Sequence, residues 1–236
     1  MATERRTELD IESARRDWRP QEALLSRRTA PVLDPLLEPL WDGVRVLAHF
    51  RGNPDGVSEG AVALIDIDGT DVTHLAPRAA NELRGRVMAS EAVIDGVLTD
   101  QALDPGIDRQ LQPGPPVPSM SPMNLFMPRR MELYEAHIPE PMVPTDAAFV
   151  AVDLLSVDDQ LLIDLPLLER KRLLDNLFAA DELLRVSPYV RPPVGPWFTS
   201  WRSAGFRGLI MKASNSRYKP GEYTPEWVEV IRLPRG

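Results

Sequence analysis

The sequence contains no cysteine, which excludes disulfide bonds, thiolate metal ligands and cysteine nucleophiles together. Its three histidines, His49, His74 and His137, are too scattered along the chain to suggest a metal cage. No apolar run approaches the roughly 18–20 residues of a membrane-spanning helix, and the first residues are charged rather than apolar. These absences predict a cytoplasmic protein with no structural metal and no membrane association.

Positive charge is also scarce, because the chain carries a net charge of −8 at pH 7. This balance argues against general affinity for nucleic acids, whose phosphates require a basic footprint. Only Lys171, Lys212 and Lys219 are lysines. Residues 201–236 depart from the acidic trend with seven basic and three acidic side chains, so a polyanion site is expected near this segment.

The 236 residues are 43% hydrophobic and 26% charged, which is typical of a globular protein with a substantial core. Residues 1–30 are polar and rich in charge, and they predict a helical or flexible extension. Residues 111–122 contain too many prolines to donate the backbone hydrogen bonds of a regular element, so they predict a loop. We therefore expect the folded domain at residues 31–233, with this Pro-rich loop inside it.

Short apolar runs bounded by turn residues dominate the domain and indicate strands, whereas leucine spacing indicates helix only locally. The runs 43–50 and 61–65 predict a hairpin around Asn53–Gly56. The remaining predicted elements are a helix at 77–86, strands over 88–98 broken at Asp95-Gly96, a strand at 149–155, one or two helices over 165–184, and strands at 208–212 and 227–231. This order predicts an α+β fold with mostly antiparallel sheets.

Several short segments follow one another in a distinctive order. They are Pro39-Leu-Trp-Asp-Gly-Val-Arg45, Ile67-Asp-Gly-Thr-Asp-Val-Thr73, Ile94-Asp-Gly-Val97, Val152-Asp-Leu-Leu155, Pro166-Leu-Leu-Glu-Arg170, Arg207-Gly-Leu-Ile-Met-Lys212, Ser216-Arg-Tyr-Lys-Pro-Gly221 and Trp227-Val-Glu-Val-Ile231. In this order and spacing the chain resembles the adenylation (nucleotidyltransferase) domain of ATP-dependent DNA ligases over about residues 31–233. The resemblance implies two mainly antiparallel β-sheets flanked by helices. It also implies a partner among DNA-repair proteins or nucleic-acid ends, and a role in DNA repair or recombination.

The first family motif is Lys-x-Asp-Gly-x-Arg, whose lysine attacks the α-phosphate of ATP and carries AMP covalently. Asp42, Gly43 and Arg45 match this motif, but Leu40 stands at the lysine position. An isobutyl side chain has no lone pair with which to attack phosphorus. The resemblance therefore comes without its nucleophile.

Other family positions depart as well. Ile67 lies in the segment that holds the sugar, Val97 and Arg207 replace the two acids that help to position a divalent metal, and Glu229 and Ile231 replace a phosphate-binding Lys-x-Lys pair. A carboxylate beside a phosphate is unfavourable by about 4 kcal/mol at an effective dielectric constant near 20. Two interpretations of Arg207 and Glu229 stay open: an ion pair that fills the vacated phosphate site, or two solvated surface charges.

The remaining nucleotide-binding candidates are Trp41, Asp42, Arg45, Asp153 and Lys212. Each also has a purely structural interpretation. Tryptophans mostly pack in cores, and Asp153 could be an acid at a strand end whose hydrogen bonds are all made within the fold. The sequence stops soon after the last motif, so we expect no C-terminal oligonucleotide-binding barrel.

Two functional hypotheses follow from these residues. In the first, the protein is a catalytically degenerate member of the family that binds a nucleotide, a nucleic-acid end or a protein partner, with no certain cofactor. In the second, it is an active ATP-dependent ligase or nucleotidyltransferase that uses a non-standard nucleophile or a partner subunit. Only the second requires ATP with Mg²⁺.

Overall fold

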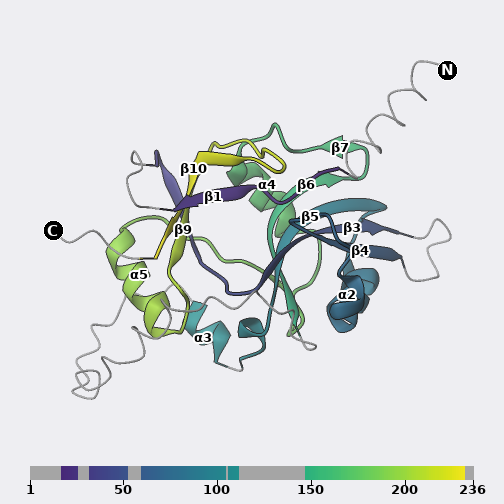
Figure 1. The fold of residues 1–236 in the computed structure, drawn as a ribbon, viewed down its shortest axis with the longest axis horizontal. Helices are drawn as coiled ribbons and strands as arrows, with labels where there is room; N and C mark the ends of the chain where they lie inside the picture. The colour runs from purple at the N-terminus through teal and green to yellow at the C-terminus, as the bar shows by residue number, and fades with distance from the viewer. Residues whose placement is uncertain (1–16, 26–31, 53–59, 105, 112–146, 232–236) are drawn as a thin grey trace.

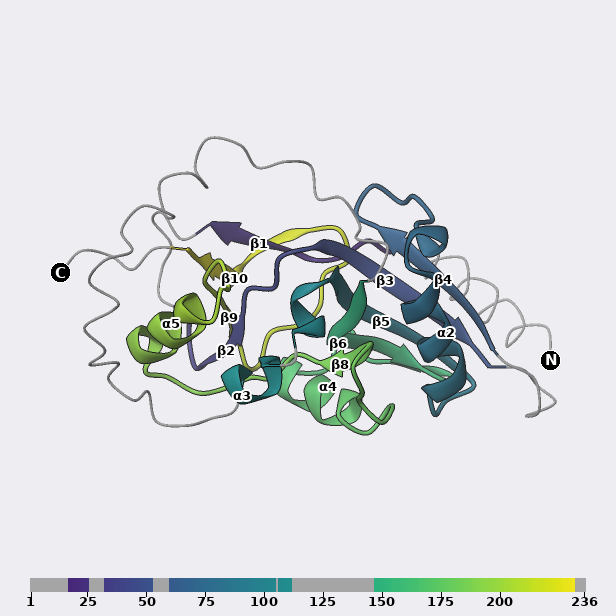
Figure 2. The ribbon, with the colours of Figure 1, turned by 90° about the horizontal axis from the view of Figure 1, so that it is seen from below.

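The computed structural model describes residues 17–25, 32–52, 60–104, 106–111 and 147–231, which form two β-sheets flanked by short helices (Figures 1 and 2). The four-stranded sheet has the order β1-β10-β9-β2. The six-stranded sheet has the order β4-β3-β5-β6-β7, with β8 paired to β6. Only two of the pairings among these strands are parallel, β1 with β10 and β6 with β8. The predicted α+β fold with mainly antiparallel sheets is therefore confirmed.

The strands are β1 (Glu22–Leu25), β2 (Pro35–Pro39), β3 (Val44–Arg51), β4 (Ala61–Asp66), β5 (Glu91–Thr99), β6 (Ala148–Val157), β7 (Gln160–Leu161), β8 (Leu184–Val186), β9 (Leu209–Ala213) and β10 (Tyr223–Val230). The α-helices are α2 (Pro77–Arg86), α3 (Ile107–Leu111), α4 (Leu167–Leu174) and α5 (Val194–Ser203), and the 3-10 helices are η1 (Thr73–Leu75) and η2 (Gln101–Leu103).

Three groups of buried side chains hold these layers together. Helix α5 contributes Trp201, which packs with Leu209 and Val230 of the four-stranded sheet. Helix α2 and the segment after α4 cover one face of the six-stranded sheet, as Figure 2 shows. A third group joins Leu36 and Trp227 of the four-stranded sheet to residues of the other sheet and to the start of α4. The inner faces of the two sheets therefore face each other across a shared, partly charged interior.

Several sequence-based boundaries differ from the structure. Residues 22–25 form a strand rather than a helix, and this strand joins the four-stranded sheet through β10. Strand β5 is continuous through Asp95-Gly96, where only its register with β6 shifts. The leucines of 165–184 build one short helix, α4, because those beyond Leu174 pack against the sheet from non-helical backbone. The predicted turn at 53–56 and nearly all of the Pro-rich loop lie outside the described residues.

Within the part of the chain that the structure describes, no helix is both long and apolar enough to cross a membrane.

Gly96 gives a sharp test of the packing between β5 and β6. A Cβ atom at this position would lie 2.3 Å from the ring of Phe149, which is fully buried. We expect Gly96→Ala to destabilise the fold by about 1–3 kcal/mol, because the ring must move in a filled core. Urea unfolding followed by circular dichroism measures the change.

Gly85→Ala is the matched control, because a Cβ atom there meets nothing within 4 Å and the residue lies in helix α2. Alanine favours helix over glycine, so this variant should be more stable by up to about 1 kcal/mol. Equal stabilities for the two variants would contradict the packing described for Gly96.

Candidate functional site

The first and last sequence motifs meet at one end of the four-stranded sheet. The backbone N–H of Leu40 donates a hydrogen bond to the carbonyl of Gly208, with an N–O distance of 3.1 Å. A Cβ atom on Gly208 would lie 2.1 Å from the carbonyl oxygen of Val230 and 3.1 Å from the Cα of Ile231. Glycine is therefore required for this close approach of the strands. Leu40 and Ile231 therefore lie on the two sides of Gly208, one next to β2 and the other next to β10.

The strand register then determines which side chains share the inner face. Ile210 on β9 pairs with both Glu38 on β2 and Glu229 on β10, so these three residues are level across the sheet. Two residues further along, Lys212 pairs in the same way with Leu36 and Trp227. Because alternate residues of a strand face the same side, Lys212, Glu38 and Glu229 all face the interior between the sheets.

Glu38 lies between two lysines in this interior. The Nζ atoms of Lys171 and Lys212 lie 2.9 Å and 3.1 Å from the same oxygen, Glu38 Oε1, and all three side chains are at most 1% exposed. The ammonium group of Lys212 also lies 4.2 Å from the centroid of the Trp227 ring, a cation–π contact. Burial lowers the pKa of Lys212 to about 8, although Glu38 favours its charged form.

A second charged group joins the sheets at Asp95 on β5. Arg45 on β3 donates two hydrogen bonds to the Asp95 carboxylate, at 3.2 Å from Nε and 2.5 Å from Nη2. The Tyr218 hydroxyl donates a third, at 2.8 Å, and itself accepts one from the backbone N–H of Gln21. Burial raises the pKa of Asp95, and the opposing effect of Arg45 does not cancel this shift. Asp95 therefore links β3 and β5 to the segment that precedes β1.

Asp153 on β6 is the third buried acid, and its partner is Arg170 on α4. Arg170 donates to both carboxylate oxygens, at 2.9 Å and 2.7 Å, and its Nη1 also donates to the carbonyls of Leu165 and Ser216. Burial alone would raise the pKa of Asp153, but Arg170 holds it below its ordinary value. The sequence leaves Asp153 open as a nucleotide-binding residue or as an acid at a strand end with a structural role. In the structure its carboxylate accepts hydrogen bonds from Arg170 and so anchors α4.

Arg207 and Glu229 lie at the edge of this interior where Leu40 and Ile231 flank Gly208, and we call this edge the mouth. Arg207 Nη1 is 3.9 Å from Asp42 Oδ1, and both side chains are substantially exposed. The described residues contain no ion pair within 4 Å between Arg207 and Glu229. Burial raises the pKa of Glu229 against the opposing charges of Arg207 and Arg45. The mouth therefore matches neither open interpretation, since the two charges are neither in direct contact nor both fully solvated.

The remaining candidates occupy less central places. Trp41 is 7% exposed, donates from Nε1 to Ser187 Oγ at 3.0 Å and packs edge-on against Phe206. Val97 is buried in the same core. Ile67 is 41% exposed in the turn after β4, an edge strand, and β3 separates β4 from β5. Trp41 and Val97 thus act in packing, and Ile67 lies apart from the charged interior.

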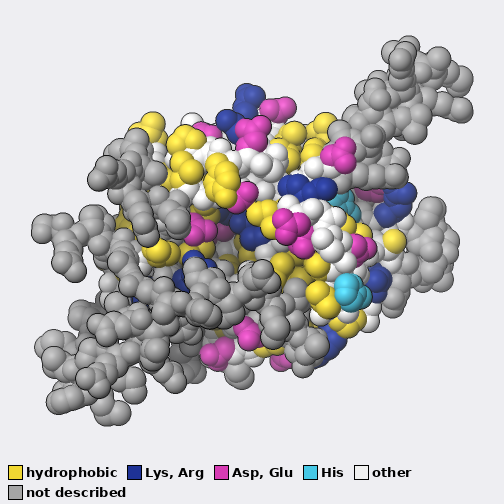
Figure 3. Space-filling model, viewed as in Figure 1, with side chains coloured by type: hydrophobic (Ala, Val, Ile, Leu, Met, Phe, Trp, Pro, Cys, Tyr) yellow, Lys and Arg dark blue, Asp and Glu magenta, His cyan; other side chains and the backbone are white. Residues whose placement is uncertain are grey.

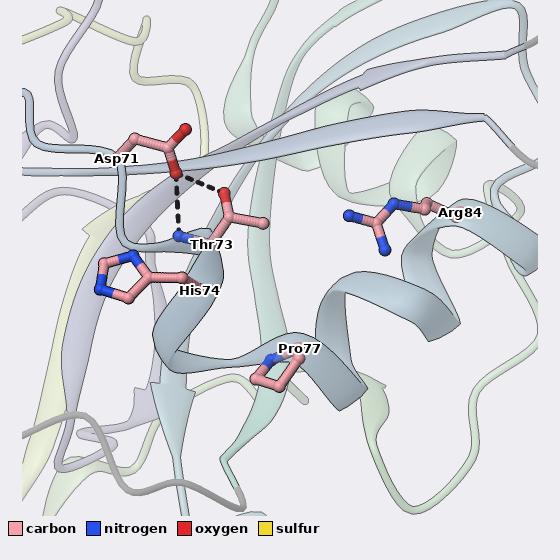
Figure 4. A pocket seen from close by; sticks show the side chains of 5 residues that line it. All are labelled: Asp71, Thr73, His74, Pro77 and Arg84. Atoms are coloured by element: carbon pink, nitrogen blue, oxygen red, sulfur yellow. Dashed lines mark hydrogen bonds between the residues drawn. The ribbon is translucent and has the colours of Figure 1, made fainter.

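An open hollow of about 500 Å³ lies elsewhere, along the turn after β4, η1 and α2 (Figure 4). Its lining residues are Asp71, Thr73, His74, Pro77 and Arg84. Asp71 accepts hydrogen bonds from the backbone and the hydroxyl of Thr73, so its polar groups serve the turn itself. Asp71 and Thr73 belong to the motif segment 67–73, but the matching residues of the other segments meet between the sheets, and we therefore place the candidate site there.

The motif order and the two facing sheets agree with a direct family match, because residues 32–230 match the model of the ATP dependent DNA ligase domain. The chain belongs to this family. The DNA ligase of Methanospirillum hungatei is 27% identical over 219 residues, which cover 88% of this chain and 39% of that protein. The multifunctional non-homologous end joining DNA repair protein LigD of Mycobacterium tuberculosis is 30% identical over 193 residues, covering 80% and 20%. This chain thus spans less than two fifths of these curated relatives.

Solved structures share the fold of this ligase-family domain. A mycobacterial DNA ligase D complexed with ATP and MES has a TM-score of 0.59 at 24% identity, over 91% of this chain and 60% of that one. The ligase domain of M. tuberculosis LigD has a TM-score of 0.58, also at 24% identity, over 91% and 59%. The adenylation-domain fold that the resemblance implied is therefore confirmed.

Within this ligase-family domain, sequence reasoning found the motif residues and missed their buried partners. Glu38, Lys171, Arg170 and Tyr218 complete the charged interior, although none was a site candidate. Arg170 and Tyr218 do stand in the motif segments 166–170 and 216–221, which is the signal that could have found them. Glu38 lies in β2, two residues before Leu40, and tertiary packing brings Lys171 to it.

The three lysines allow a direct test of the pKa of Lys212 in the ligase-family domain. In a sample labelled with ¹³C at the lysine ε-carbons, we expect one of three signals to titrate near pH 8 and to vanish in Lys212→Met. Because folding lowers this pKa, the protonated lysine destabilises the fold. Stability should therefore rise between about pH 8 and pH 10.5, and this rise should shrink in Lys212→Met.

Lys219→Met is the control, since Lys219 is exposed and its loss should leave the signal near pH 8 in place. Titration of all three signals above pH 10 would contradict the buried environment described for Lys212.

Proposed function

We propose that this ligase-family domain has lost self-adenylylation and acts as a binding or regulatory module in DNA repair or recombination. One observation carries this proposal: Leu40, at the family's nucleophile position, lies beside Gly208 and Ile231 with Glu229 on the same sheet. An aliphatic chain cannot attack a phosphate. The positions that would hold phosphates present one carboxylate and one further aliphatic side chain instead.

The residues present do not fit ATP with Mg²⁺. Asp95 and Asp153 each accept two hydrogen bonds from an arginine, so neither carboxylate is available to a metal. Val97 is packed in the core, and Arg207 brings a cation to the other position where the family has an acid. The described residues contain no group of three or more acidic or histidine side chains that could hold a metal ion.

A protein that acts in DNA repair is the partner we favour over a nucleic-acid end. The relatives include DNA ligases and the repair protein LigD, which supports this setting. The net charge of −8 works against strong binding to phosphates. On the face drawn in Figure 3, acidic and basic side chains are interspersed over the described residues. We propose a cytoplasmic location for the same module.

A second candidate function is an active nucleotidyltransferase with a non-standard nucleophile. Lys212 supports it, because a pKa of about 8 leaves a useful fraction of neutral amine at neutral pH. Its burial argues against it, since the side chain is 1% exposed and its Nζ lies 3.1 Å from the Glu38 carboxylate. Within this second candidate, a partner subunit is the alternative to a non-standard nucleophile.

We expect no covalent AMP adduct when the protein is incubated with α-labelled ATP and Mg²⁺ or Mn²⁺. Denaturing electrophoresis separates covalent label from bound nucleotide. A ligase with an intact motif lysine serves as the positive control. Label that survives denaturation and maps to Lys171, Lys212 or Lys219 would establish the second candidate function and exclude the first.

We further expect that Leu40→Lys alone will not restore self-adenylylation, because Glu229 would still face the phosphates and no acid would recruit the metal. Combining it with Val97→Glu, Arg207→Glu and Glu229→Lys should produce measurable ATP binding by calorimetry, since it removes about 4 kcal/mol of repulsion at one close charge pair. Tight ATP binding by the unaltered protein or by Leu40→Lys would show that the pocket still recognises nucleotides.

A further inference from the structure

Glu229 differs from the other acids of the site because no described residue forms a hydrogen bond or an ion pair with its carboxylate. By contrast, Asp95, Asp153 and Glu38 are all held by arginine or lysine side chains. Glu229 is half-buried on the inner face of β10, and burial raises its pKa. A carboxylate that has lost part of its hydration without gaining a hydrogen bond is destabilised, and a ligand that donates a hydrogen bond to it would recover that cost.

The two arginines near Glu229 are already engaged. Arg45 makes two hydrogen bonds to Asp95, and Arg207 lies 3.9 Å from Asp42. Each of these arginines therefore has another carboxylate as its closest partner, and Glu229 is left without a hydrogen-bond donor among the described residues. A group that complements this mouth carries a positive charge.

The surroundings of Glu229 define what should carry that charge. Leu40 and Ile231, both half-buried, flank Gly208 from its two sides at the same end of the sheet, and Ile231 is two residues after Glu229. Aliphatic side chains next to a carboxylate suit the long apolar stem and charged head of arginine or lysine. Arginine fits better, because its planar guanidinium can donate two parallel hydrogen bonds to one carboxylate.

We propose that the mouth between the two sheets is a docking site for a basic side chain, foremost an arginine, presented by a protein partner. The proposal rests on the proposed function, since it names the chemistry of the partner that the degenerate domain would bind. The guanidinium pairs with Glu229, and its stem covers Leu40 and Ile231. A triphosphate or a phosphodiester would place negative charge against Glu229, so this mouth selects against the family's usual ligand.

Short peptides test this chemistry with the full chain. The probes are acetyl-Gly-Leu-Arg-Leu-Gly-amide and the same peptide with citrulline, which keeps the shape of arginine but has no charge. Titrations followed by ¹⁵N–¹H NMR report affinity and location together. We expect the arginine peptide to shift the backbone signals of residues 40–45 and 227–231, and to bind about tenfold more tightly than the citrulline peptide.

Glu229→Gln removes the charge while keeping the size of the side chain, and we expect it to lower affinity for the arginine peptide about tenfold and to abolish the preference over citrulline. Glu226→Gln is the matched control: it removes the same charge from the same strand at another half-buried position. Its affinity and peptide preference should equal those of the unaltered protein. NMR spectra that are unchanged away from the substituted residue show that each variant folds.

The outcomes separate this inference from the proposed function. Equal binding of the two peptides, or an equal loss in both variants, would overturn the arginine site. If the protein also forms no AMP adduct, the proposed function still stands. ATP binding that shifts the same residues would overturn both.

Discussion

The interior between the two sheets depends on pairing every deeply buried carboxylate with a cation. An unpaired buried charge costs several kcal/mol, so each acid constrains the elements that supply its partner. Asp153 and Arg170 connect β6 to α4 and, through the Ser216 carbonyl, to the segment after β9. On the neighbouring strand, Asp95 connects β3, Tyr218 and the chain before β1. These two acids, opposite one another in the β5–β6 register, tie the layers of the domain together.

The motif positions fall into two groups, according to whether they take part in the buried packing and charge pairs. Those that match the ligase pattern contribute to packing or pairing: Gly208 lets β10 approach, Arg45 neutralises Asp95, and Lys212 lies beside Glu38. Of those that depart, Leu40, Arg207 and Glu229 lie at the mouth, whereas Val97 is packed in the core and Ile67 lies apart. Substitution at the mouth leaves the buried pairs intact. This difference gives a physical reason why a domain can keep the family fold while the side chains at its mouth change.

Much of the fold could be predicted from local pattern. Alternating apolar residues and turn residues located most strands, and the order of the motifs indicated the family. Local pattern failed where tertiary contacts determine structure. Strand β1 exists because Glu22–Leu25 pairs with β10, which lies about 200 residues later in the chain. Likewise, the leucines beyond Leu174 are buried without being helical, so their spacing overstated the helix.

The candidate site likewise contains features that the sequence predicts and features that depend on tertiary contacts. The sequence by itself predicted that Leu40 occupies the family's nucleophile position and that acidic and basic residues are exchanged at 207 and 229, since these predictions need only a motif register. Only the tertiary structure decided that Asp153 pairs with Arg170, that Glu38 lies between Lys171 and Lys212, and that Glu229 has no hydrogen bond or ion pair with another described residue. The physical reason is that charge pairing depends on distance and on the exclusion of water. Both are properties of the packed sheets, because the paired residues are far apart in the chain.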